Sequence, residues 1–170
     1  MTASVALTVT GALAAVALIS LLLAGLTKPA WRIWPAPPAG SARSLAFWTL
    51  FRILNVVTLI LAALRAPVVI ENAAARPLHA LLLTASAGAF VVYGFALWAL
   101  GRTGTYCRAS GLQTRGIYQW ARNPQYTAAM VAFSLLAVAV NDMSVAALTA
   151  ALVLAYGLMA LNEEPWLEAA

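Results

Sequence analysis

The chain has 170 residues, of which 64% are hydrophobic and only 9% are charged, and its formal net charge is +5. A soluble domain would carry roughly 25% charged residues, so this composition excludes a soluble globular protein and indicates an integral membrane protein. The basic residues fall between apolar runs and form no basic face, which argues against a nucleic-acid partner.

Apolar runs along the chain predict an all-α, polytopic membrane helical bundle with about five spans, in one domain over 1–170. The runs lie at 4–26, 45–66, 78–100, 127–140 and 144–161, and about 20 residues are needed to cross a bilayer. The first run lacks the basic start and cleavage site of a secretory signal, so we expect a retained span. The fourth run is short and is predicted to form a helical hairpin with the fifth. Asn141-Asp142 would be its turn, with Asp142 or Ser144 as the helix cap.

The basic residues also predict an orientation. If the long loop 101–126 faces the cytoplasm, the loop 27–44 and the C-terminal segment 162–170 face it too. The cytoplasmic side then collects Lys28, Arg32, Arg43, Arg102, Arg108, Arg115 and Arg122, whereas the other side has Arg65 and Arg76. This positive-inside bias predicts an outer N-terminus and a cytoplasmic C-terminus, in what we expect to be a bacterial inner membrane.

Two polar clusters are predicted to meet where the hairpin opens at the cytoplasmic face. Arg122-Asn123-Pro124-Gln125-Tyr126 precedes the fourth run, and Glu163-Glu164 follows the fifth. Arg122 can pair bidentately with a carboxylate or a phosphate, and Pro124 suits the first position of a helix. The spacing alone leaves two interpretations open, a structural ion pair that locks the hairpin or a binding site.

A further charge lies inside the second run. Arg52 either snorkels back to the interface or points into the bundle together with Asn55, where both would contact a substrate. The chain has one cysteine, Cys107, and one histidine, His79, and they provide no ligand set for a metal ion. We therefore expect chemistry that needs no bound metal.

The order of these motifs resembles the isoprenylcysteine carboxyl methyltransferase family and the related phospholipid methyltransferases. Members show a Gly-x-Tyr segment, an Arg-(His or Asn)-Pro-x-Tyr segment, a hairpin and a Glu-Glu pair. Here these are Gly116-Ile117-Tyr118, Arg122 to Tyr126, and Glu163-Glu164, so the resemblance covers about the last third of the chain.

The chain departs from the family pattern at two places. Asn123 stands where histidine is frequent, which removes a titratable base. Relatives usually continue with a basic tail, so a chain that stops at Ala170 is expected to be shortened or to have a more open site.

The resemblance implies S-adenosylmethionine as the cofactor and a lipid-like acceptor, either a prenylated thiol or carboxylate or a lipid amine, reached from the surrounding membrane lipids. The implied cofactor-binding residues are Gln113, Thr114, Gly116, Ile117, Tyr118, Arg122, Asn123, Pro124, Tyr126, Glu163 and Glu164. Arg122 and Glu164 are the implied catalytic residues. Two alternatives are an NADPH-dependent membrane sterol or isoprenoid reductase and an accessory membrane protein without enzymatic activity. The small residues along the spans pack equally well within or between chains, so the oligomeric state is not predicted.

Overall fold

A computed structural model of the chain describes residues 3–34, 37–38, 40–70, 76–105 and 113–169. Within these residues every regular element is helical, which confirms the predicted all-α class. The α-helices are α1 (Ala3–Thr27), α2 (Ala42–Ile70), α3 (Arg76–Thr105), α4 (Pro124–Val140) and α5 (Met143–Ala169). Two short 3-10 helices, η1 (Pro29–Trp31) and η2 (Gly116–Gln119), lie in the connections.

The helices have the length and composition of membrane spans. Among the described residues, four helices are long and apolar enough to cross a membrane: Ala3–Thr27, Ala42–Ala66, Arg76–Gly101 and Met143–Glu168. The helix Pro124–Val140 is apolar but shorter, as the fourth run predicted. Large apolar side chains such as Leu13, Val16 and Leu81 are exposed on the outside of the bundle, as expected of surfaces that face lipid.

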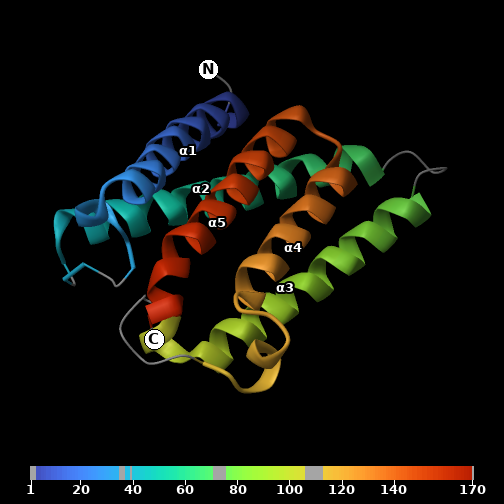
Figure 1. Cartoon of the computed structure of the whole chain (residues 1–170). Helices are drawn as coiled ribbons and strands as arrows, with labels where there is room; N and C mark the ends of the chain where they lie inside the picture. The colour runs from blue at the N-terminus through green and yellow to red at the C-terminus, as the bar shows by residue number, and fades with distance from the viewer. Residues whose placement is uncertain (1–2, 35–36, 39, 71–75, 106–112, 170) are drawn as a thin grey trace.

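The fifth helix lies at the centre of the bundle. It packs against α1 on one side and α4 on the other, while α3 packs mainly against α4 and α1 packs against α2 (Figure 1). The buried core joins large side chains from four helices, among them Leu22, Phe47, Leu54, Phe133, Leu152 and Tyr156. The end of α3, the start of α4 and the end of α5 come together at one end of the molecule (Figure 1).

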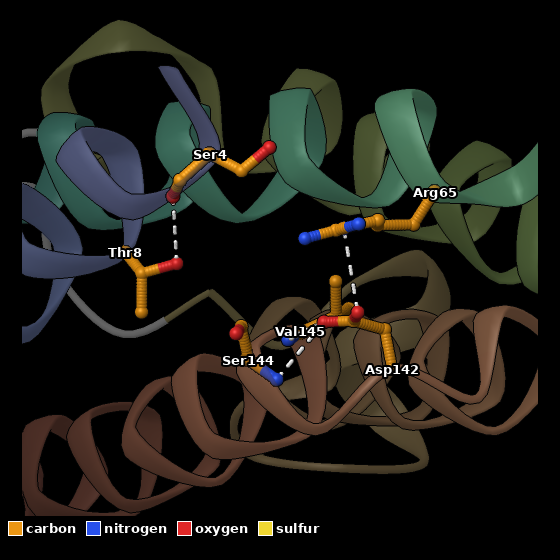
Figure 2. Close-up of polar contacts among 6 residues, drawn as sticks. All are labelled: Ser4, Thr8, Arg65, Asp142, Ser144 and Val145. Atoms are coloured by element: carbon orange, nitrogen blue, oxygen red, sulfur yellow. Dashed lines mark hydrogen bonds and ion pairs between the residues drawn. The ribbon is translucent and has the colours of Figure 1, made fainter. Parts of the chain in front are cut away.

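The turn of the α4–α5 hairpin is built as the sequence predicts. Asn141 ends α4 in the left-handed region, with φ of 51°. Asp142 Oδ1 accepts the backbone amides of Ser144 at 2.9 Å and Val145 at 3.2 Å, so Asp142 is the cap of α5. Its other carboxylate oxygen lies 3.3 Å from Arg65 Nε of α2, which ties the turn to that helix (Figure 2).

The last helix extends further than its apolar run. We expected the fifth run to end at 161, but α5 continues to Ala169 and includes Glu163 and Glu164. Polarity ends an apolar run, whereas glutamate, leucine and alanine all favour continued helix. The two glutamates therefore lie on the last turns of a helix, and their side chains point in directions that the helix determines.

Candidate functional site

A short loop segment places the polar cluster Arg122–Tyr126 at the open end of the α4–α5 hairpin. We call this end, where α4 begins and α5 ends, the mouth of the hairpin. Gly116 is the first residue of the 3-10 helix η2 and has a positive φ of 64°, a backbone conformation that glycine adopts without strain. Pro124 is the first residue of α4, as predicted, because a helix needs no amide donor at that position. Asn123 precedes it but makes no side-chain capping bond, so its amide is available for other contacts.

Tyr118 fastens this loop to the helices beneath it. Its side chain is buried, and its hydroxyl lies 3.2 Å from the Ala96 carbonyl of α3 and 3.0 Å from Gln125 Oε1 of α4. Burial, together with the nearby charge of Glu163, raises the pKa of the Tyr118 hydroxyl above its ordinary value of 10.0. The hydroxyl therefore keeps its proton and acts as a donor that holds the loop between the two helices.

The predicted pairing between the two clusters is present. Arg122 donates through Nη1 to Glu164 Oε1, which joins the start of α4 to the end of α5. The Arg122 side chain is 67% exposed and that of Glu164 is 37% exposed. Exposed pairs of this kind stabilise a protein by about 0–1 kcal/mol, so the contact adds little to the stability of the hairpin.

The neighbouring carboxylate has a different environment. Glu163 is half-buried and interacts with the hydroxyl of Tyr126. The Asn123 amide, in the orientation that matches its neighbours, donates to Glu163 Oε2 at 3.2 Å. No ion pair involves Glu163 in the part of the chain that the structure describes. The two adjacent glutamates thus differ: Glu164 pairs with an arginine near the surface, whereas Glu163 contacts the neutral side chains of Asn123 and Tyr126.

Glu163 lies at a cavity between α2, α3, α4 and α5. Aromatic side chains form much of its wall, and the lining residues are Trp34, Trp48, Phe51, Tyr93, Leu97, Leu100, Gly104, Thr105, Gln125, Tyr126, Tyr156, Met159 and Glu163. Its volume of about 60 Å³ admits a small group, whereas whole cofactors occupy pockets of about 300–1,000 Å³. A larger ligand would place one part in this cavity and the rest toward the mouth of the hairpin. A carboxylate among aromatic rings is an environment that attracts a cation.

The structure brings some of the predicted site residues together and separates others. Tyr126 and Glu163 line the cavity, and Arg122, Asn123 and Glu164 lie beside it at the mouth. The remaining residues are not part of the lining. Gln113 donates to the Ala99 carbonyl of α3 at 3.1 Å, Tyr118 and Pro124 are buried, Ile117 is half-buried, and Thr114 and Gly116 are exposed.

The two residues that we expected to contact substrate from α2 point in different directions. Arg52 is exposed, whereas Asn55 is half-buried and accepts a hydrogen bond from the Tyr156 hydroxyl at 3.1 Å. Asn55 also donates to the Phe51 carbonyl at 2.8 Å. Asn55 therefore supports the aromatic wall of the cavity, and Arg52 does not join it.

Sequence reasoning missed several residues of the cavity. Gln125 is only 3% exposed and lines the cavity, although it stands at the variable position of the Arg122–Tyr126 segment. The signal available in the sequence was a polar side chain in the first turn of a predicted apolar helix. Trp48 and Phe51 occupy one face of α2 by their spacing, which also could have been noticed. The sequence carries no comparable signal for Tyr93 or Tyr156.

Comparison with known proteins gives one match. The model of the family described as "Phospholipid methyltransferase" matches residues 75–170, which include α3, η2, α4 and α5. No curated protein and no solved structure matches the chain. The matched region contains both polar clusters and most of the cavity lining, whereas α1 and α2 lie outside it.

Proposed function

The chain belongs to the phospholipid methyltransferase family, and from that premise we propose that it transfers a methyl group from S-adenosylmethionine to a lipid-like acceptor. Membership of the family makes it a membrane methyltransferase, in keeping with its apolar helices. The proposal adds the identity of the donor, the class of acceptor and the position of the site. The site is the aromatic cavity at Glu163 together with the mouth of the α4–α5 hairpin.

The observation that carries the proposal is the half-buried Glu163 carboxylate beside aromatic rings. A carboxylate removed from water and without a cationic neighbour is unfavourable, and a bound cation would relieve it. S-adenosylmethionine supplies a methyl group already activated by a positively charged sulfonium. Trp48, Phe51 and Tyr126 line the cavity, and aromatic rings attract such a cation in addition to the carboxylate. The residues present therefore fit this cofactor.

The same charge balance argues against the reductase alternative. NADPH carries several phosphates, and a site for it would need several cationic side chains. The charged side chain among the lining residues of the cavity is that of Glu163, which is acidic, and Arg122 at the mouth is in contact with Glu164. An anionic cofactor would therefore meet a carboxylate at the position where a cationic one is stabilised.

The chain's own residues would contribute alignment and exclusion of water. Glu163 and Tyr126 would orient a cationic or hydroxyl-bearing part of the cofactor. Arg122 is largely exposed and keeps further guanidinium donors, so it would hold an anionic group such as a carboxylate or a lipid phosphate. The apolar and aromatic wall keeps water from the reacting centre, which strengthens these contacts and prevents hydrolysis. Alignment of this kind is the main requirement of a direct displacement.

The acceptor is proposed to reach the site from the bilayer. α2 and α3 make little contact with each other, and residues of both line the cavity. A lipid-like acceptor could therefore place its polar head near Glu163 while its chains stay among the lipids. With the positive-inside rule, the arginines near this end favour a site at the cytoplasmic face of an inner membrane.

A direct assay tests the proposal. Purified protein in detergent is mixed with labelled S-adenosylmethionine and a native lipid extract, and the lipids are analysed by mass for an added methyl group. We expect a methylated lipid whose formation is lost in Glu163→Gln. Binding of NADPH without binding of S-adenosylmethionine would overturn the proposal in favour of a reductase. The mass of the product identifies the acceptor as an amine, a thiol or a carboxylate.

A further inference from the structure

A buried contact joins the end of α1 to the turn of α5 that carries the glutamates. Asn162 directly precedes Glu163 and is only 1% exposed. Its amide nitrogen donates to the Leu22 carbonyl of α1 at 3.1 Å and to the Leu158 carbonyl of α5 at 2.8 Å. A side-chain amide has two N–H donors, so both are used. The Asn162 side chain thus links α1 to α5.

The same side chain fits closely against Gly25. The Asn162 Oδ1 atom is buried and has no hydrogen-bond partner among the described residues. A Cβ atom added at Gly25 would lie 2.4 Å from this oxygen, closer than non-bonded atoms can approach. The absence of a side chain at Gly25 therefore permits the contact. Gly25 and Asn162 form a matched pair, which we name the Gly25–Asn162 contact.

The helical turn that carries Glu163 and Glu164 is weakened by a missing backbone hydrogen bond. Pro165 lies inside α5 and has no backbone N–H, so the Leu161 carbonyl lacks its usual donor four residues later. Proline inside a helix also bends it. Glu163 and Glu164 lie between Leu161 and Pro165, in the stretch that loses this bond. Their placement therefore depends on tertiary contacts, and the bonds of Asn162 to α1 and α5 lie one residue before them.

We infer that the Gly25–Asn162 contact is a positioning device, through which α1 orients the last turns of α5 so that Glu163 faces the cavity. This inference rests on the proposed function, because it concerns the same site. Asn162 acts through Glu163 and is a positioning residue. The region matched by the family begins at residue 75, so α1 contributes from outside the matched part of the chain.

The test compares four variants with the unaltered protein in detergent. Gly25→Ala and Asn162→Ala each disturb the contact, and the double variant removes the collision because the asparagine side chain is absent. Gly11→Ala is the matched control. It adds the same methyl group to the same helix, 2.8 Å from Leu148 Cδ1 of α5, away from the glutamates. Each protein is measured for its Kd for S-adenosylmethionine, its Tm, and the hydrogen exchange of amides 159–168 without ligand.

We expect Gly25→Ala and Asn162→Ala each to raise the Kd about tenfold, as loss of a buried hydrogen bond at the site would. Exchange of amides 159–168 should rise in both. The double variant should match Asn162→Ala alone, because Gly25 acts only through Asn162. Gly11→Ala should lower the Tm and leave the Kd and this exchange unchanged.

Two results separate the possible failures. If Gly25→Ala and Asn162→Ala change the Tm but neither the Kd nor the exchange, the contact is a packing contact and the inference is overturned. If the unaltered protein does not bind S-adenosylmethionine, the proposed function fails. In that case the hydrogen-exchange measurement by itself tests the inference, because it needs no ligand. Equal exchange in Asn162→Ala and the unaltered protein would overturn it.

Discussion

An arginine–carboxylate ion pair lies at each end of the α4–α5 hairpin. The acidic residues at the two ends differ in the partners that they have. At the turn, both oxygens of Asp142 have partners: Oδ1 accepts two amides of α5, and Oδ2 pairs with Arg65. At the mouth, Arg122 pairs with Glu164, and Glu163 stands beside them without an ion pair in the described structure. One end is balanced in charge, and the other carries an additional carboxylate.

This difference supports the proposed position of the site at Glu163. The balanced pair at the turn, together with the helix cap, holds two helices together, and both oxygens of its carboxylate already have partners. A half-buried carboxylate next to an aromatic cavity keeps its capacity to bind a cation. Because Glu164 is held in the ion pair with Arg122, the proposed ligand contact is with its neighbour Glu163.

The largest effect is expected from Glu163→Gln, which removes the charge at the cavity but keeps the shape of the side chain. Hydrogen bonds to charged groups contribute about 1.5–3 kcal/mol, so binding of S-adenosylmethionine should weaken about 10- to 100-fold. The Tm should not fall, because the variant no longer holds a half-buried charge. Titration of the cofactor and thermal unfolding measure both quantities.

Glu168→Gln is the matched control for this variant. Glu168 is an exposed glutamate on the same helix, so its substitution changes net charge equally without touching the cavity. Its affinity for S-adenosylmethionine should equal that of the unaltered protein. Equal affinities in Glu163→Gln and Glu168→Gln would refute a role for Glu163 in the site.

A smaller effect is expected from exchanging the charges at the mouth. Arg122→Glu combined with Glu164→Arg restores an ion pair, and exposed pairs contribute about 0–1 kcal/mol, so stability should be nearly unchanged. Methyl transfer should remain about tenfold lower, because the guanidinium that is proposed to hold an anionic group has been moved to the other helix. Full recovery of activity would instead identify the pair as a lock without a further role.

Much of this fold could be predicted from the pattern of apolar runs. The helical class, the short α4 and the Asn141-Asp142 turn follow from where apolar residues begin and end. The contact between Arg122 and Glu164 follows from folding one helix back on the next. These are consequences of chain connectivity, and they need no knowledge of how each helix is rotated.

The roles of individual side chains could not be predicted in the same way. Adjacent residues on a helix differ by about 100° in direction, so Asn162 faces α1 while Glu163 faces the cavity. Helix geometry sets that angle but not the rotation of α5 as a whole, which packing on α1 and α4 determines. For the same reason Asn55 reaches Tyr156 while Arg52 is exposed, although their spacing suggested a shared face.

At the opposite end of the hairpin, Asp142→Ala should reduce stability and leave the site intact. Loss of a helix cap costs about 0.5–2 kcal/mol, and loss of the pair with Arg65 adds to it. Unfolding by a denaturing detergent measures the change, and the Kd for S-adenosylmethionine should stay the same. Arg65→Gln, which keeps the cap, should show a smaller loss. A weakened Kd in Asp142→Ala would show that the two ends are coupled.

The smallest effect is expected from Tyr118→Phe, and its size depends on pH. Near neutral pH the variant loses one buried hydrogen bond, which contributes about 0.5–1.5 kcal/mol. The pKa of Tyr118 is raised in the folded protein above its ordinary 10.0, so above that pH the unfolded chain releases this proton while the folded protein keeps it. The unaltered protein therefore loses stability as the pH rises above 10.0. The variant has no Tyr118 hydroxyl to ionise, so its stability does not fall for this reason. The stability difference between the two should shrink above pH 10.0, and a constant difference would mean that burial does not raise this pKa.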